Sequence, residues 1–94
     1  MAKINLDLNL TTIEGKEIQD GGNPIELGSC LLYALARKEE GQTMAESLEY
    51  YALRKLLFKG GEVELTSEQI TTLKNKSHAF DSNVFYAIVD LLEG

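Results

Sequence analysis

A signal for the start of a helix recurs along this 94-residue chain. An Asn or Thr stands three residues before a Glu or Gln in Asn23-Pro24-Ile25-Glu26, Thr43-Met44-Ala45-Glu46 and Thr66-Ser67-Glu68-Gln69. In such a capping box the first side chain accepts from the N–H of the third helical residue, and the Glu or Gln bonds back to the N–H of the cap. Asp81 marks a fourth start that lacks the reciprocal partner. The chain after residue 23 is therefore predicted to form four short helices, at about 24–38, 44–58, 67–79 and 82–93.

The first residues alternate polar and apolar side chains, as in a half-buried strand. The strand predicted over 3–10 has one apolar face, formed by Ile4, Leu6, Leu8 and Leu10. Gly15 can adopt a positive φ, so we expect a tight turn there and a short returning strand. Asp20-Gly21-Gly22 is interpreted as a flexible joint into the first helix. The predicted fold is α+β, a single domain over 1–94 with a small N-terminal β-hairpin, which a short strand at 62–65 could extend, and about four short helices.

The charge of the chain is negative and unevenly distributed. The formal net charge is −6; residues 1–53 carry four basic and nine acidic side chains, a net −5, whereas residues 54–94 carry five and six. Nucleic-acid phosphates bind clustered Lys and Arg, so direct nucleic-acid binding is not expected. With 44% hydrophobic and 26% charged residues, the composition is that of an ordinary folded domain.

Few residues in the chain could carry chemistry. Cys30 and His78 are the only cysteine and the only histidine. A nucleophilic triad needs a base beside its nucleophile, and zinc needs several Cys or His ligands at close spacing. Glu39-Glu40 and the pair Glu46 and Glu49 are interpreted as solvated carboxylates. We therefore predict no catalytic, cofactor-binding or metal-binding residues, no cofactor, and a protein that is not an enzyme.

The start of the chain lacks the apolar stretch that follows a basic start in a secretory signal. No apolar run approaches the roughly 18 residues of a membrane-spanning helix, and a single cysteine cannot form an internal disulfide. These features predict a cytoplasmic protein without membrane contact.

The helix predicted at 44–58 carries apolar residues on two faces. One row consists of Leu48, Tyr51, Ala52 and Leu56, and the other of Tyr50, Leu53, Leu57 and Phe58. A helix that is apolar on two faces is either central in its own domain or exposed to a partner. We interpret the first row as core and the second as the partner-binding surface. Burial of both rows within one chain is the alternative.

The order of several segments resembles small proteins commonly encoded by tailed bacteriophages and prophages. The likeness rests on Ala2-Lys3-Ile4-Asn5-Leu6-Asp7, the Gly15-Lys16 turn, Leu27-Gly28 and Glu62-Val63-Glu64-Leu65-Thr66. These segments are structural and include no catalytic signature. The resemblance therefore implies a phage or prophage origin, with a place in the bacterial host cytoplasm or the virion, and implies no reaction.

Two functions from different classes follow. The first is a non-enzymatic phage or prophage interaction protein that contacts a protein partner or copies of itself, in assembly or in an accessory role. The second is an acidic host-directed inhibitor that mimics DNA and occupies a basic groove. The second apolar row at 44–58 favours the first hypothesis, and the net −5 charge of residues 1–53 motivates the second.

Overall fold

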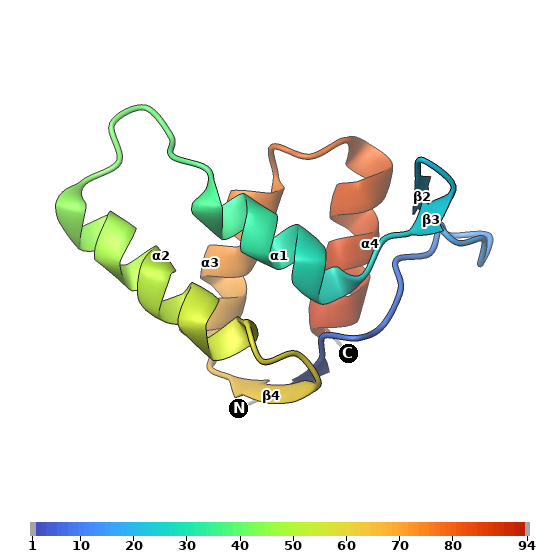
Figure 1. Cartoon of the computed structure of the whole chain (residues 1–94), viewed down its shortest axis with the longest axis horizontal. Helices are drawn as coiled ribbons and strands as arrows, with labels where there is room; N and C mark the ends of the chain where they lie inside the picture. Colours follow the sequence, from blue (N-terminus) through green and yellow to red (C-terminus); the bar gives the residue numbers. More distant parts are fainter. Residues whose placement is uncertain (1, 94) are drawn as a thin grey trace.

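The chain folds into two small sheets and four helices in a computed structural model that describes residues 2–93 (Figure 1). In chain order the elements are β1 (Ala2–Asn5), β2 (Gln19–Asp20), β3 (Asn23–Pro24), α1 (Leu27–Ala36), α2 (Met44–Leu57), β4 (Glu62–Leu65), α3 (Ser67–Ser77) and α4 (Ser82–Glu93). β1 pairs with β4 in antiparallel orientation, from Ala2 opposite Leu65 to Asn5 opposite Glu62. This arrangement confirms the α+β class and the strand at 62–65.

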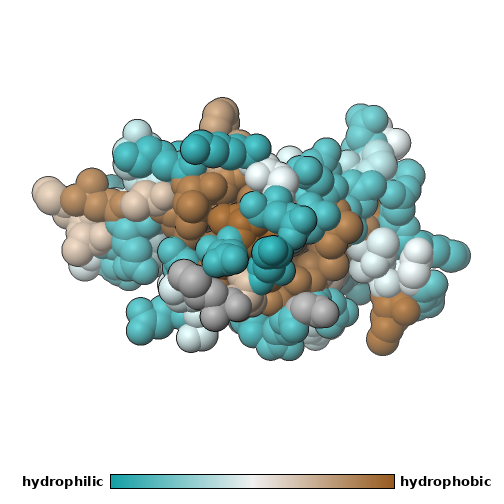
Figure 2. Space-filling view, turned by 90° about the horizontal axis from the view of Figure 1, so that it is seen from below, coloured by the Kyte–Doolittle hydropathy of each residue, from teal (hydrophilic) through white to brown (hydrophobic). Residues whose placement is uncertain are grey.

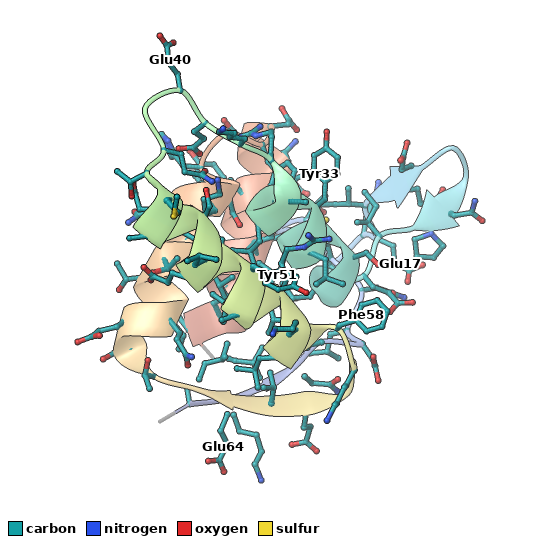
Figure 3. All side chains as sticks on the ribbon, turned by 60° about the vertical axis from the view of Figure 1, so that its left-hand side comes forward. Glu17, Tyr33, Glu40, Tyr51, Phe58 and Glu64 are labelled. Atoms are coloured by element: carbon teal, nitrogen blue, oxygen red, sulfur yellow. The ribbon has the colours of Figure 1, made fainter. Side chains whose placement is uncertain are left out.

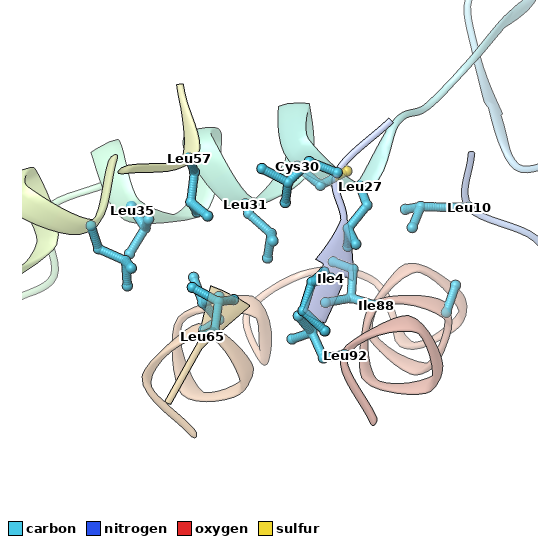
Figure 4. Packing of buried hydrophobic residues seen from close by; sticks show 14 residues of the cluster. Ile4, Leu10, Leu27, Cys30, Leu31, Leu35, Leu57, Leu65, Ile88 and Leu92 are labelled. Carbon is cyan, nitrogen blue, oxygen red and sulfur yellow. The ribbon is translucent and has the colours of Figure 1, made fainter. Parts of the chain in front are cut away.

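A cluster of buried apolar side chains joins the β1–β4 sheet to the helices (Figure 4). It comprises Ile4, Leu6, Leu10, Leu27, Cys30, Leu31, Leu35, Leu53, Leu57, Leu65, Leu73, Ala87, Ile88 and Leu92. α1 supplies a leucine at every fourth position, at Leu27, Leu31 and Leu35, which places them on one face of the helix. α1 packs against both α2 and α3, so this face forms the centre of the core.

Two of the predicted helix starts are complete capping boxes. The Thr43 Oγ1 accepts from the Glu46 N–H at 3.1 Å, and the Glu46 carboxylate accepts from the Thr43 N–H at 3.0 Å. Thr66 and Gln69 form the same pair of bonds at 3.1 and 2.9 Å. Asp81 directly precedes α4, and its carbonyl accepts the first helical bond, from the Phe85 N–H. These starts need only residues close in sequence, and all three are confirmed.

The Thr43 box makes stability sensitive to acid. The bond from the Thr43 backbone N–H lowers the pKa of Glu46. A carboxyl with a lowered folded-state pKa stabilises the fold above its unfolded value, about 4.3, and this contribution is lost as the pH falls through the folded pKa. We expect the free energy of unfolding to fall less steeply below pH ~4.3 in Glu46→Gln than in the wild type. Urea titrations across this pH range measure the free energy of unfolding, with Glu49→Gln as the control. If this free energy falls with pH equally steeply in Glu46→Gln and the wild type, the expectation is contradicted.

The predicted start of the first helix at Asn23 is wrong. α1 begins at Leu27, and Glu26, which precedes it, makes no side-chain cap bond. Residues 23–24 instead form β3 and pair with β2. The N–H groups of Leu27 and Gly28 donate to the carbonyls of Leu8 and Leu6, at 2.8 and 2.9 Å. The backbone of residues 6–8 therefore takes the place of a capping side chain, which satisfies the free N–H groups of the helix start.

This backbone contact makes Gly28 sensitive to substitution. A Cβ at Gly28 would lie 3.1 Å from the Leu6 carbonyl oxygen and 3.2 Å from the Leu6 Cβ. Overpacking costs about 1–3 kcal/mol, whereas Gly to Ala in a helix gains at most ~1 kcal/mol. We expect Gly28→Ala to lower the free energy of unfolding in urea titrations, while the exposed neighbour Ser29→Ala changes it little. A Gly28→Ala chain that is as stable as the wild type would contradict the close approach of Gly28 to Leu6.

The N-terminal segment is less regular than the predicted strand over 3–10. The extended pairing ends at Asn5, where the Asn5 side chain accepts from the Asp7 N–H at 3.0 Å. Because the chain turns here, Leu8 is exposed, whereas Ile4, Leu6 and Leu10 are buried as predicted. The turn at Gly15 is present, with a bridge between Thr11 and Glu17.

The segment predicted as a flexible joint is a tight turn. Gly21 and Gly22, with φ of 60° and 86°, connect β2 to β3. Two consecutive positive φ values suit a two-residue hairpin turn and favour glycine at both positions.

Candidate docking surface on α2

α2 presents an apolar face to solvent. We call the exposed residues Met44, Leu48, Tyr51 and Phe58 the α2 outer face; their exposed fractions are 79%, 61%, 54% and 79%. Leu56, which is 42% exposed, lies about 140° around the helix axis from Tyr51, beside Leu53 and Gln69. Figure 3 labels Tyr51 and Phe58 on the exposed side of the helix. Figure 2 shows hydrophobic surface at the left end of the molecule, where α2 lies. Four large apolar side chains on one exposed helix face are unusual unless another surface covers them.

The predicted roles of the two α2 rows are reversed. Leu53 and Leu57, predicted to bind a partner, are 5% and 1% exposed and lie in the core of the chain itself. Tyr50 is partly buried against the same core, and only Phe58 of the predicted partner-binding row is exposed. The other row, Leu48, Tyr51, Ala52 and Leu56, was predicted as core and is exposed. Because both are buried in the core where α2 packs against α1, neither is available to a partner in the folded chain.

Lys76 connects α3 to the loop between α1 and α2, residues 37–43. This lysine is 3% exposed, and its Nζ donates to the Arg37 carbonyl at 2.8 Å. The same Nζ lies 3.5 Å from the Glu39 carboxylate and 4.7 Å from the centre of the Tyr50 ring. These contacts hold Tyr50 on the α3 side of α2. Leu53 and Leu57, three and seven residues later, face the same side because of the helical period, so the opposite row is turned to solvent.

Tyr50 is held at this position in its protonated form. Partial burial, followed by the nearby Glu46 carboxylate, raises the pKa of Tyr50. Its hydroxyl donates to the second carboxylate oxygen of Glu46 at 3.5 Å. The first turn of α2 is thereby connected both to its cap and to α3.

The α2 outer face has basic residues along and beside it. Arg54 and Lys55 lie in the second half of the helix and Lys59 just after it. Glu46 and Glu49 face the α3 side instead, beside Tyr50 and Gln69. The Lys55 Nζ lies 4.7 Å from the centre of the Tyr51 ring, a cation–π distance. A shallow pocket of about 200 Å³ lies beside this pair, lined by Leu32, Tyr51, Arg54, Lys55 and Phe58. The surface is thus apolar, shallow and flanked by charge, which suits contact with another protein more than enclosure of a small molecule.

Cys30 and His78 lie in different environments. Cys30 belongs to the core, and burial raises the pKa of its thiol. His78 follows the end of α3, is exposed, and meets the edge of the Phe85 ring at 5.1 Å. In the part of the chain that the structure describes, no three His, Cys, Asp or Glu side chains gather as they would around a metal ion. None of the helices within residues 2–93 is long and apolar enough to cross a membrane.

Sequence reasoning exposed the wrong side of α2. It missed Met44, and it assigned Leu48, Tyr51 and Leu56 to the core. Comparisons of the chain with protein-family models, with curated proteins and with solved structures gave no match.

Proposed function

We propose that this chain is a non-enzymatic phage or prophage protein that acts by contact with another protein chain through the α2 outer face. The exposure of that face is the observation that carries the proposal. Met, Tyr and Phe are enriched in protein interfaces, and they provide three of its four residues. The phage origin and a place in the host cytoplasm or the virion are supported by the resemblance of the sequence segments.

The size of the face supports binding. Full burial of one Leu, Met or Phe side chain contributes about 1.5–3 kcal/mol, whereas association costs at least about 4 kcal/mol of lost freedom. One exposed side chain cannot offset this cost, but several on one face can.

The α2 outer face is also held in place before any partner binds. The Thr43 capping box fixes the first turn of α2, and Leu53 and Leu57 anchor the helix in the core. Lys76 holds the preceding loop. Binding therefore requires little further ordering of the backbone, which reduces the entropy cost of association.

Photo-crosslinking inside bacterial cells that carry the gene tests the proposal. Benzoylphenylalanine replaces Tyr51 on the α2 outer face in one variant and Tyr86, an exposed tyrosine of α4, in the control. We expect irradiation to join a second chain to the protein from position 51 and not from position 86. Mass spectrometry identifies the joined chain. No product from position 51 above the level of position 86 would overturn the proposed function.

A further inference from the structure

We infer that a cavity between α1, the start of α4 and the β2–β3 hairpin binds a small aromatic amine. Its volume is about 460 Å³, which lies within the range of about 300–1,000 Å³ that small-molecule sites occupy. The cavity is lined by Asp20, Ile25, Ser29, Cys30, Tyr33, Phe80 and Val84. None of these residues belongs to α2, so a ligand here leaves the α2 outer face free, and the site is independent of the proposed docking function.

The floor of the cavity is apolar and recessed. Ile25, Phe80 and Val84 are partly buried and pack against the core cluster, and Cys30 is 9% exposed. Burial raises the pKa of the Cys30 thiol, so this group is protonated near neutral pH and behaves as a small, polarisable apolar surface. The inner part of the cavity therefore accepts an uncharged, apolar group.

One wall of the cavity is aromatic. The rings of Tyr33 and Phe80 stack with their centres 6.0 Å apart and their planes inclined by 27°, which leaves no room for a third ring between them. Tyr33 is 63% exposed, and Figure 3 shows it projecting from α1 toward solvent. A flat ligand ring can therefore extend the existing pair on its open side, where offset or edge-to-face contacts are favourable beyond the area that they bury. The wall thus favours an aromatic ring over an aliphatic group of the same size.

The rim of the cavity carries a negative charge. Asp20, at the end of β2, is the only charged residue among those that line the cavity. It is exposed, and it forms none of the ion pairs found within residues 2–93. An ammonium group on the ligand would pair with this carboxylate, whereas a carboxylate on the ligand would be repelled by it. The apolar floor, the aromatic wall and this single rim carboxylate together select an aromatic ring that carries an amine.

Titration of the full chain with phenethylamine, followed by NMR of the backbone amides, tests the site. We expect saturable shifts at the lining residues, with a dissociation constant of roughly 0.1–10 mM for so small a ligand. Two related compounds separate the ring from the charge. Phenylpropionate keeps the ring and reverses the charge, so it should bind at least about tenfold more weakly. Cyclohexylethylamine keeps the charge without the aromatic ring and should bind about 2–10-fold more weakly.

Two substitutions of lining residues, with a matched control, locate the binding. Ser29→Phe introduces a ring at an exposed helix position and fills the cavity, so binding of phenethylamine should be lost. Asp20→Asn should lower the affinity for phenethylamine and remove its preference over phenylpropionate. Glu40→Gln changes the net charge by the same amount at an exposed position of the loop between α1 and α2 (Figure 3), and it should bind phenethylamine like the wild type. The NMR spectra confirm that each variant is folded.

The thiol at the floor of the cavity gives a second measurement. Methyl methanethiosulfonate modifies Cys30, the only cysteine of the chain, and phenethylamine should slow this reaction in proportion to the fraction of chains that hold it. An unchanged rate at saturating phenethylamine would overturn the site. Equal affinities of Asp20→Asn and Glu40→Gln for phenethylamine, or unchanged binding in Ser29→Phe, would also overturn it, because they would show only the general attraction of an amine to a chain with a net charge of −6.

Discussion

Leu57→Asp is expected to unfold the chain, whereas Leu48→Asp leaves it folded. Leu57 is 1% exposed in the core, and Leu48 is 61% exposed on the α2 outer face. Loss of a buried leucine costs about 2–5 kcal/mol, and an unpaired buried charge adds several kcal/mol more. A domain of this size has a total stability of about 5–15 kcal/mol, so the core substitution removes most or all of it.

Circular dichroism and thermal melts of the two variants measure this difference. Both introduce the same side chain into the same helix, so intrinsic helix propensity is matched. The helix dipole disfavours the Asp at position 57, the last residue of α2, by only about 0.3–1 kcal/mol. A folded Leu57→Asp chain, or an unfolded Leu48→Asp chain, would contradict the orientation of α2.

Lys76→Ala is expected to lower the free energy of unfolding by about 2–4 kcal/mol. The substitution removes a charged hydrogen bond to the Arg37 carbonyl, worth about 1.5–3 kcal/mol, together with the packing of the buried lysine stem. Lys76→Met keeps most of the stem and should cost less than Lys76→Ala.

Lys74→Ala is the matched control for Lys76. It lies two residues earlier in α3 and pairs with the exposed Glu93, so we expect an effect below about 1 kcal/mol. Urea titrations measure the free energy of unfolding of the Lys76→Ala, Lys76→Met and Lys74→Ala chains. In addition, Lys76→Ala should speed hydrogen exchange in residues 38–43, because the loop loses its anchor. Equal stability of the Lys74→Ala and Lys76→Ala chains would show that the buried ammonium does not hold the loop.

The features predicted correctly from sequence depend on neighbouring residues. The capping boxes at Thr43 and Thr66 bond across three residues, so the sequence pattern contains the whole interaction. The start of α1 could not be found in this way. Its N–H groups bond to carbonyls of Leu6 and Leu8, about twenty residues earlier, and any residue type offers a carbonyl. The capping-box pattern at Asn23 therefore predicts a helix start at a place where residues 23–24 form a strand.

The orientation of α2 was missed because helical periodicity identifies faces and not which of them is buried. Charge does not separate them, because each row is interrupted at the same spacing. Lys55 lies four residues after Tyr51 and three before Phe58, and Arg54 lies four after Tyr50 and three before Leu57. The sequence also contains no signal for the burial of Lys76, since lysine is rarely buried without a specific partner.

The pairing of β1 with β4 has a consequence for the time course of folding. The paired residues are separated by about sixty residues of sequence, and contacts of such long range slow folding. At a synthesis rate of roughly 5–20 residues per second, β1 has no partner strand for several seconds, while α1 and α2 are being made. Ile4 and Leu6, both buried in the finished fold, are open to chaperones or to other nascent chains during that interval. Among the strands that the structure describes, the one that is made first has to wait for the one that is made last.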